Sequence, residues 1–293
     1  MSEELFVGIT SWNSEKFLRH CLESLYEKTK ASTKVVVLDN CSTDSSPDVA
    51  KRWGAEVIVR KMHQPDALNL LLSISRSKYT LLVHSDVIFL SPQWYEGCLR
   101  EMRSDVALIS PQDIGCGPYT RPWGKGMPES SFMFFDTAKI RKARSFRWVR
   151  RFRLRLPVRR LDLYHRNVTH GLPNHLRRKG LTWVPMKVHT SQKLERPIYS
   201  RPQGAQVWSE ELAHLQYGMG NFYSIGGIIT HYHNWFERAL DDCTGDSEGI
   251  LQSTGGFPLE YIKLYSKTFI DDYRAGKIAV PDVTVPERDP RAI

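Results

Sequence analysis

Short apolar runs alternate with amphipathic stretches through the first 110 residues of this 293-residue chain. Apolar runs bounded by polar residues predict buried strands, and apolar residues spaced three and four apart predict helices. The predicted strands are 5–10, 34–38, 55–60, 79–83 and 106–110. The predicted helices are 14–29, 47–53, 66–75 and 92–102. This alternation predicts an α/β fold with a mostly parallel sheet and helices on both faces.

The pattern is less regular after residue 112, so we expect one half at 1–112 and a second at 113–280. In the second half, residues 131–135 suit an added strand, 161–179 look helical in part, and 181–188 predict a strand ending at His189. Further helices are expected at 208–217 and 259–273. The Pro-rich tail, 281–293, is expected to be disordered.

Two of the apolar runs end in a carboxylate, Asp39 after 34–38 and Asp86 after 79–83. Ligands of open α/β sheets collect at the carboxyl ends of parallel strands. We therefore expect Asp39 and Asp86 where an α/β enzyme would hold a nucleotide and its metal ion.

The overall composition, 41% hydrophobic and 25% charged, is typical of a soluble globular protein. The acidic start and the lack of about 18 uninterrupted apolar residues predict a cytoplasmic protein. The five cysteines are odd in number and scattered, so we expect reduced thiols and neither a disulfide framework nor a zinc knuckle.

The net charge of +9 is concentrated in one segment, 139–160, which holds eleven basic residues and no acid. Aromatic and aliphatic residues are interleaved with its arginines, which favours an interfacial helix or strand over a loose tail. Such a segment suits an anionic partner, either an anionic membrane surface or a nucleic acid. A solvated basic face is the alternative interpretation.

Four segments at the predicted strand ends resemble the successive signatures of family 2 glycosyltransferases with the GT-A fold. They are VGITSWN at 7–13, VVLDNCSTD at 36–44, ALN at 67–69 and the strand that ends in HSD at 84–86. The resemblance covers roughly residues 5–112. It implies a nucleotide-sugar-binding half at 1–112, followed by a more variable acceptor-binding half that contains the basic segment.

The resemblance also implies roles for single residues in the first half. Asp39 would hydrogen-bond the nucleobase, and Thr10 and Asn13 would line the same base and ribose pocket. Ser85 and Asn69 would belong to the nucleotide site, Asn69 facing the diphosphate. A surface amide is the alternative interpretation of Asn69.

Asp86 matches the last acid of the family's Asp-x-Asp motif, which holds Mn²⁺ or Mg²⁺ on the sugar diphosphate. His84 stands where the family usually has the first Asp, and it could bind metal, hydrogen-bond the sugar or simply end the strand. The resemblance suggests His231 as a second metal ligand and leaves His189 as a sugar or metal candidate. A structural histidine is the alternative at each position.

An inverting transfer needs a base for the acceptor hydroxyl, and the family supplies an Asp from the acceptor half. Asp162 is our candidate, Asp113 and Glu129 compete with it, and a salt bridge to nearby arginines is its alternative role. The expected function is transfer from a nucleotide-diphosphate sugar, with UDP favoured, to a lipid-linked or surface glycan at the inner face of the membrane. Glycosylation of modified DNA bases and an inactive GT-A module that binds nucleic acid or membrane are the alternatives.

Overall fold

The computed structural model describes residues 4–89, 92–111, 127–142, 146, 149–150, 165–166, 168–169, 171–190, 221–224 and 228–231. The strands are β1 (Leu5–Ser11), β2 (Thr33–Asp39), β3 (Glu56–Val59), β4 (Tyr79–His84), β5 (Val87–Phe89), β6 (Val106–Pro111), β7 (Phe132–Asp136), β8 (Val149–Arg150), β9 (His165–Arg166), β10 (Thr182–Thr190), β11 (Asn221–Ser224) and β12 (Ile228–His231). The helices are α1 (Glu15–Lys28), α2 (Ser46–Arg52), α3 (Gln64–Ile74), α4 (Trp94–Glu101), α5 (Thr137–Lys142) and α6 (Leu172–Arg177).

Ten of the described strands form one sheet in the order β3-β2-β1-β4-β7-β6-β10-β11-β12-β5. In the seven strands from β3 to β10, only β7 runs against its neighbours. The other three strands extend the sheet with antiparallel pairings, which bring β12 alongside β5. The prediction of a mostly parallel sheet is confirmed for the seven-stranded part.

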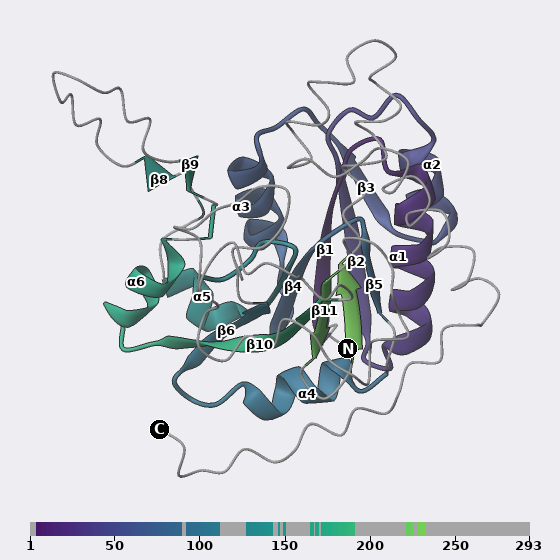
Figure 1. Ribbon diagram of the computed structural model, residues 1–293. Helices are drawn as coiled ribbons and strands as arrows, with labels where there is room; N and C mark the ends of the chain where they lie inside the picture. Colours follow the sequence, from purple (N-terminus) through teal and green to yellow (C-terminus); the bar gives the residue numbers. More distant parts are fainter. Residues whose placement is uncertain are drawn as a thin grey trace, which may run out of the picture.

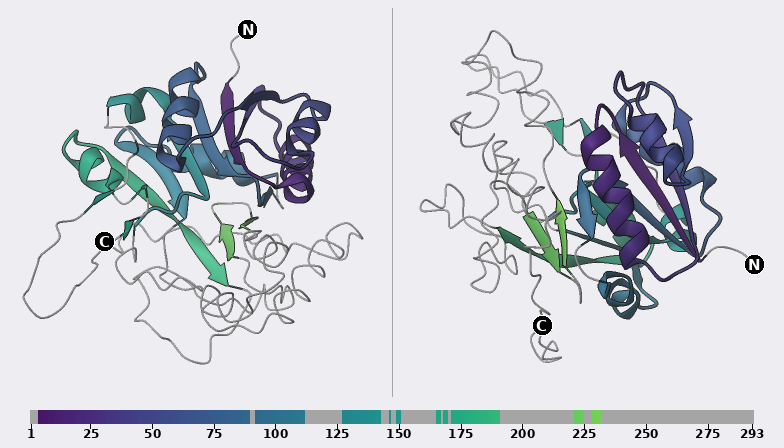
Figure 2. Two further views of the ribbon diagram at one scale, coloured as in Figure 1. Left: turned by 90° about the horizontal axis from the view of Figure 1, so that it is seen from above. Right: turned by 90° about the vertical axis from the view of Figure 1, so that its right-hand side faces the viewer.

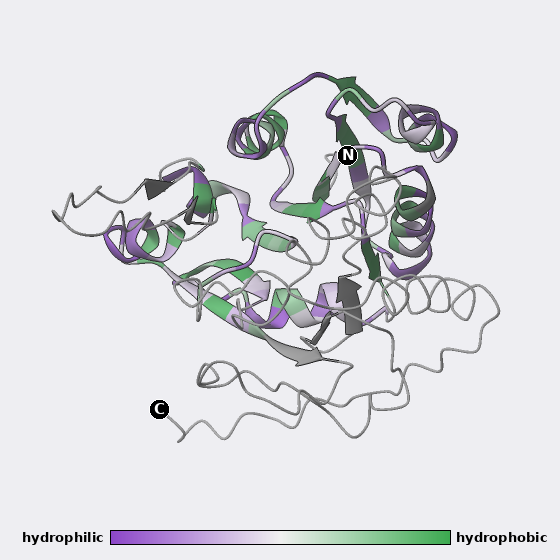
Figure 3. Ribbon diagram, turned by 45° about the horizontal axis from the view of Figure 1, so that its top comes forward, coloured by the Kyte–Doolittle hydropathy of each residue, from purple (hydrophilic) through white to green (hydrophobic). Residues whose placement is uncertain are grey.

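Helices cover both faces of the sheet, as predicted (Figure 1; Figure 2). Side chains alternate along β1, so that Leu5, Val7 and Ile9 join the core under α1, α2 and α4, while Phe6 joins the core under α3, α5 and α6. Figure 3 shows the apolar stripe of α1 turned towards the sheet and its polar side turned away. None of the described helices is long and apolar enough to cross a membrane.

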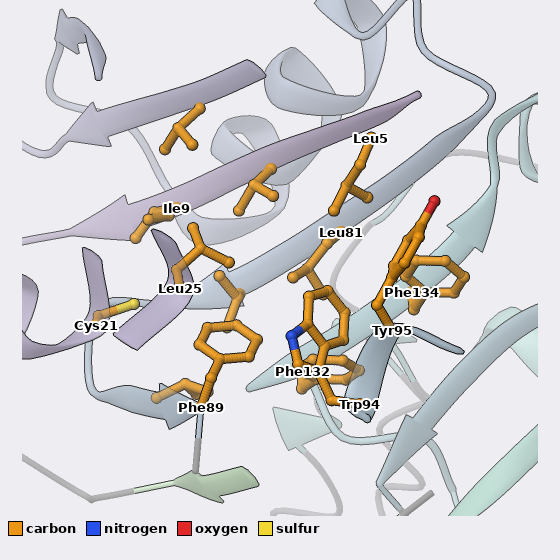
Figure 4. Packing of buried hydrophobic residues seen from close by; sticks show 14 of the residues in the cluster. Leu5, Ile9, Cys21, Leu25, Leu81, Phe89, Trp94, Tyr95, Phe132 and Phe134 are labelled. Carbon is orange, nitrogen blue, oxygen red and sulfur yellow. The ribbon is translucent and has the colours of Figure 1, made fainter. Parts of the chain in front are cut away.

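An aromatic cluster fixes the chain just after Asp86 (Figure 4). The ring centroid of Phe89 in β5 lies 5.0 Å from that of Trp94 in α4 and 6.4 Å from that of Phe132 in β7. All three side chains are fully buried, and large buried aromatic groups contribute strongly to stability. The short strand that follows Asp86 is thereby anchored in the core.

Several boundaries differ from the predictions for physical reasons. Strand β5 was not predicted, because three residues are too few to give a strand pattern. Helix α3 starts at Gln64, two residues early, since Pro65 occupies its first turn, where a missing N–H costs nothing. The expected helices at 208–217 and 259–273, and the tail 281–293, lie outside the described residues.

The beginning of the basic segment is helical and is bound to the sheet domain. In α5, Lys139 donates through Nζ to the carbonyl oxygens of Arg103 and Val106, both at 2.8 Å. The Arg141 guanidinium donates to the carbonyl oxygens of Leu72 and Ser75 at the end of α3. These two basic side chains therefore stabilise the fold by joining α5 to neighbouring parts of the chain.

Candidate functional site

Strands β1, β2 and β4 are parallel and end at the same edge of the sheet. Ser11 is in register with Asp39 on one side, and Thr10 is in register with His84 on the other. Asp39 and His84 therefore flank the carboxyl end of β1, and Asp86 follows two residues later. The structure brings together the strand ends that the sequence singled out, as open α/β sheets do at their ligand sites.

Asp39 lies fully buried at the end of β2. Its carboxylate accepts hydrogen bonds from the backbone N–H and the hydroxyl of Ser42, at 2.7 and 2.5 Å. A carboxylate offers about four lone-pair sites, so these two contacts fix the group and leave acceptor capacity. Asp39 can thus act as an oriented acceptor for an N–H group of a nucleobase.

Asn13 joins the loop after β1 to the loop after β2. Its backbone N–H donates to Ser42 Oγ at 2.8 Å, and its Oδ1 accepts from the Thr43 N–H at 2.9 Å. Thr10 contributes its carbonyl oxygen, which accepts from the Ser85 N–H at 3.2 Å. The predicted nucleotide residues Thr10, Asn13 and Ser85 thus lie at one edge, and their nucleotide contacts stay predictions.

A chain segment from Arg60 to Gln64 runs across this edge from β2 to β4. The Arg60 N–H donates to the Asp39 carbonyl oxygen at 2.8 Å, and the Met62 N–H donates to Asn40 Oδ1 at 2.6 Å. Gln64 then reaches His84, with 3.2 Å between their two Nε2 atoms. The sequence reasoning missed Asn40 and Gln64, although Asn40 directly follows the conspicuous Asp39.

His84 and Asp86 lie over α1 at the end of β4. The His84 N–H donates to the Ser131 carbonyl oxygen at 3.0 Å, and the Cys21 thiol of α1 donates to the His84 carbonyl oxygen at 3.8 Å. Asp86 is 7% exposed. Burial, together with the negative charge of Asp86, raises the pKa of the Cys21 thiol far above its ordinary value. The thiol therefore stays protonated beneath the site.

The residues at this edge fit a divalent cation held largely by a bound diphosphate. Strand β12 places His231 in register with Val87, the residue after Asp86, whereas His189 in β10 is in register with Phe222. Among the described residues, no three His, Cys, Asp or Glu side chains gather into a metal site. Mg²⁺ commonly takes one or two carboxylates plus substrate phosphates and waters, a set that Asp86 can begin.

Asn69 has a structural role that the sequence did not indicate. Its Nδ2 donates to the Phe146 carbonyl oxygen and its Oδ1 accepts from the Phe146 N–H, both at 2.8 Å. Phe146 is 3% exposed and packs in the core under α3. The side-chain amide thus pairs with a backbone peptide of the basic segment, and its predicted nucleotide contact stays a prediction.

The candidate base Asp162 and its competitor Asp113 lie outside the described residues. Glu129, the third candidate, is described and lies at the site edge. Its N–H donates to the Pro111 carbonyl oxygen at 2.9 Å, and its carbonyl oxygen accepts from Ser110 Oγ at 2.7 Å. Glu129 stands two residues before Ser131, whose carbonyl oxygen accepts a hydrogen bond from the His84 N–H.

Part of the chain is similar in sequence to proteins named as glycosyltransferases. Over 95 residues it is 28% identical to glycosyltransferase GlyG of Streptococcus pneumoniae serotype 4, a match that covers 30% of this chain and 32% of that protein. The chain spans about a third of the length of the curated relatives it matches.

Solved structures with low sequence identity were also found. The mannosyltransferase PcManGT of Pyrobaculum calidifontis, solved with GDP-Man and Mn²⁺, has a TM-score of 0.46 at 12% identity, covering 96% of this chain and 78% of that one. Glucosyl-3-phosphoglycerate synthase of Mycobacterium tuberculosis, solved with UDP, has a TM-score of 0.41 at 16% identity, covering 48% of this chain and 59% of that one.

The sequence model described as glycosyl transferase family 2 matches residues 6–159, slightly more than half of the chain. The matched range contains all of β1 except Leu5 and all of β2 to β7. It includes Asp39 and His84 at the ends of β2 and β4, and Asp86 just before β5. The α/β sheet with helices on both faces is the GT-A architecture of this family. This chain belongs to glycosyl transferase family 2.

Proposed function

We propose that this chain transfers a sugar from a nucleotide-diphosphate sugar, with UDP favoured, to an acceptor hydroxyl with inversion. One observation carries the proposal: in a family 2 chain, the buried Asp39 and the chain leading to Asp86 flank the carboxyl end of β1. An acceptor fixed for a nucleobase and a carboxylate available to a cation are what a donor of this class requires.

The donor is bound along the edge from β2 to β4. Asp39 accepts a hydrogen bond from a ring N–H of the base, while Thr10 and Asn13 line the base and ribose. Ser85 and Asn69 lie towards the diphosphate, and His84 and His189 are the candidates to contact the sugar. The register of Thr10 with His84 supports this order, because it sets the His84 strand end directly beside β1.

Asp86 and His231 would hold a divalent cation, Mn²⁺ or Mg²⁺. When bound, such an ion supplies positive charge to the departing diphosphate. The support is the β12–β5 pairing, which places the backbone of His231 opposite Val87. Asp86 fits this role as an oxygen ligand of a hard cation.

Asp162 in the acceptor half is the proposed base, taking the proton of the acceptor hydroxyl as that oxygen attacks the anomeric carbon. Glu129 is the second candidate, because its backbone lies at the same sheet edge as His84. Replacing either carboxylate with its amide separates the two, since only the true base should lose transfer without losing donor binding.

The acceptor is proposed to be a lipid-linked or surface glycan, reached by a cytoplasmic protein at the inner face of the membrane. The basic segment supports an anionic surface as partner. Because Lys139 and Arg141 bind backbone carbonyl groups, the docking role would fall on the basic residues from Lys142 to Arg160.

The donor and the metal are tested together by measuring nucleotide release from UDP-, dTDP- and GDP-sugars, with and without Mn²⁺. Asp86→Ala should lower release by at least about tenfold, equivalent to ~1.4 kcal/mol. Asp48→Ala is the matched control, since Asp48 is an exposed acid on α2 that lies 3.6 Å from Lys51. Full release by Asp86→Ala would refute the metal role.

The acceptor surface is tested by comparing binding to anionic liposomes with binding to duplex DNA at the same ionic strength. We expect the liposomes to be preferred. Tighter binding to duplex DNA would overturn the membrane proposal and favour modification of DNA bases.

A further inference from the structure

The side chain at position 84, where family 2 usually has an acid, is held by a neighbour that no sequence signature indicates. Gln64 Nε2 lies 3.2 Å from His84 Nε2, and both side chains are half-buried. Gln64 is the first residue of α3, so its backbone is fixed by the helix that it begins. The ring of His84 therefore meets a rigid element through one defined atom.

The position of Gln64 beside His84 is also fixed by hydrogen bonds to the end of β2, where Asp39 is proposed to bind the nucleobase. Residues 60–64 are tied to the end of β2 by the Arg60 N–H on the Asp39 carbonyl oxygen and by the Met62 N–H on Asn40 Oδ1. The same short segment thus touches both proposed donor-binding strand ends. A conformational change at Asp39 can therefore be transmitted to His84 through residues 60–64.

The chemistry of the contact determines where the imidazole proton lies. An amide nitrogen can only donate, so a hydrogen bond from Gln64 Nε2 requires a lone pair on His84 Nε2. A neutral imidazole that accepts at Nε2 carries its proton on Nδ1, and the partner of one ring nitrogen sets the state of the other. The contact thereby selects one tautomer of His84.

We propose that Gln64 is a positioning residue that fixes His84 as the Nδ1–H tautomer and keeps its Nε2 from becoming a metal ligand. This inference rests on the proposed function for the role of the ring, which is to hydrogen-bond the sugar diphosphate. Of the three roles open to His84, the contact argues against metal binding through Nε2. Asp86 is then a ligand of the cation, and His84 is not.

A histidine at this position in place of the usual acid also changes the charge beside the diphosphate. The usual acid would put a second negative charge two residues from Asp86, whereas the Gln64–His84 pair adds none. Like charges at short range repel, so the lack of a second carboxylate here lessens repulsion of an anionic donor. The expected consequence is weaker binding of Mn²⁺ alone than in a His84→Asp variant.

The tautomer can be read directly by long-range ¹H–¹⁵N NMR on ¹⁵N-histidine-labelled full-length protein, with His84→Gln assigning the signals. In the wild type we expect a pyrrole-like Nδ1 and a pyridine-like Nε2. Gln64→Leu should give averaged signals of both tautomers. Gln64→Glu should make Nε2 pyrrole-like, because a carboxylate only accepts and requires a proton on that atom. Ser73→Ala, an exposed change elsewhere on α3, is the control and should match the wild type.

Metal binding and kinetics supply the second readout. Titration with Mn²⁺ alone should give a higher affinity for Gln64→Leu than for the wild type, because His84 Nε2 no longer has its hydrogen-bond donor. Asp86→Asn should lose at least tenfold in affinity. Gln64→Leu should lower kcat for transfer roughly tenfold, the lower end of what loss of an orienting partner costs, with little change in the KM for the acceptor.

Two results would overturn the inference: an Nε2–H tautomer in the wild type, or a His84→Gln variant that loses Mn²⁺ affinity as strongly as Asp86→Asn. A Gln64→Leu spectrum identical to that of the wild type would do the same. Failure of the proposed function is distinguishable, because it would show as absent nucleotide binding while the tautomer pattern still responds to Gln64.

Discussion

Asn13 and Cys41 adopt left-handed backbone conformations, with φ of 45° and 60°. Both lie in the loops that follow β1 and β2, next to Asp39. Such conformations cost free energy in residues other than glycine and persist only where the surroundings hold them. Here the hydrogen bonds of Asn13 with Ser42 and Thr43 hold the two loops together. The sheet edge that carries Asp39 is therefore built on a locally strained pair of loops that hydrogen bonds hold together.

The Asp39 carboxylate gives the first prediction. In Asp39→Asn one acceptor oxygen becomes an NH₂ donor, which faces either the Ser42 N–H or the base N–H. We expect nucleotide affinity, measured by calorimetry, to fall at least tenfold, or about 1.4 kcal/mol. Ser42→Ala keeps the carboxylate and should cost less. A folded Asp39→Asn that binds nucleotide as tightly as the wild type would contradict the base-reading role.

Asn69 gives the second prediction. In Asn69→Asp the new carboxylate would still accept from the Phe146 N–H, but its other oxygen would face the Phe146 carbonyl oxygen. We expect this change to lower the free energy of unfolding by about 1–3 kcal/mol, measured in urea, with Ser73→Ala as control. Unchanged stability would refute the structural role. A loss of nucleotide affinity in addition would support the predicted diphosphate contact.

At the scale of elements, the site depends on how closely α3 packs on β1. A Cβ atom added to Gly8 would lie 2.8 Å from Leu82 Cδ2 and 3.1 Å from Leu71 Cβ. Gly8→Ala should therefore destabilise the fold by about 1–3 kcal/mol through overpacking. The cost should be smaller in a Leu82→Ala background, since the nearest atom is then gone. Equal costs in the two backgrounds would argue against this contact as the cause.

Two buried thiols, Cys21 in α1 and Cys98 in α4, make the stability of the fold sensitive to alkaline pH. The thiol pKa values of Cys21 and Cys98 are raised by burial, with the Asp86 charge adding to the effect on Cys21. Above the ordinary thiol pKa of about 8.5, the unfolded chain loses these protons while the folded chain keeps them. Stability is thus fully present below that pH and is lost as pH rises, by up to about 1.4 kcal/mol per pH unit for each thiol.

Urea unfolding between pH 7 and 10.5 tests whether the free energy of unfolding falls as the pH rises. Cys21→Ala should have a flatter alkaline decline than the wild type, although its stability at pH 7 is lower because a buried side chain is truncated. Cys41→Ser, at an exposed thiol, should decline as the wild type does. An alkaline slope unaffected by Cys21→Ala would contradict the buried-thiol explanation.

At the scale of the whole molecule, a strand from the second half of the chain pairs with a strand from the first half. Strands β11 and β12, more than 130 residues after β5 in sequence, place His231 in register with Val87. Figure 2 shows these two strands beside the end of β10. The candidate metal site is therefore shared between the family-matched half and a segment outside the family match.

Thr230→Pro tests whether β12 completes the site. Thr230 lies between Phe222 and Ile88, and proline removes a ladder hydrogen bond from a strand paired on both sides. We expect transfer activity to fall by at least about tenfold, while nucleotide affinity, set by β1, β2 and β4, changes little. Thr230→Val keeps the strand and is the control. Normal transfer by Thr230→Pro would show that β12 is dispensable.

The local pattern of apolar and polar residues was sufficient to predict the elements of the first half of the fold. The alternating apolar runs predicted β1 to β4, β6 and the helices between them within a few residues, because each element buries a face that its own period encodes. Strand β5 and the return of β12 carry too few residues for such a signal. For Asn69 and Gln64, the partner residues lie 77 and 20 positions away, so no local pattern indicates the contacts.

The sequence by itself determined that the chain is an α/β protein of family 2, and that Asp39 and Asp86 stand at strand ends on one edge. Continuous apolar runs must be buried on both faces, so they form a covered parallel sheet whose ligand edge is at the carboxyl ends of the strands. Only the tertiary structure decided that His84 is held by Gln64, that Asn69 pairs with the backbone of Phe146, and that His231 returns opposite the residue after Asp86. Those contacts join distant parts of the chain, and their free energy exists only once the sheet has brought the parts together.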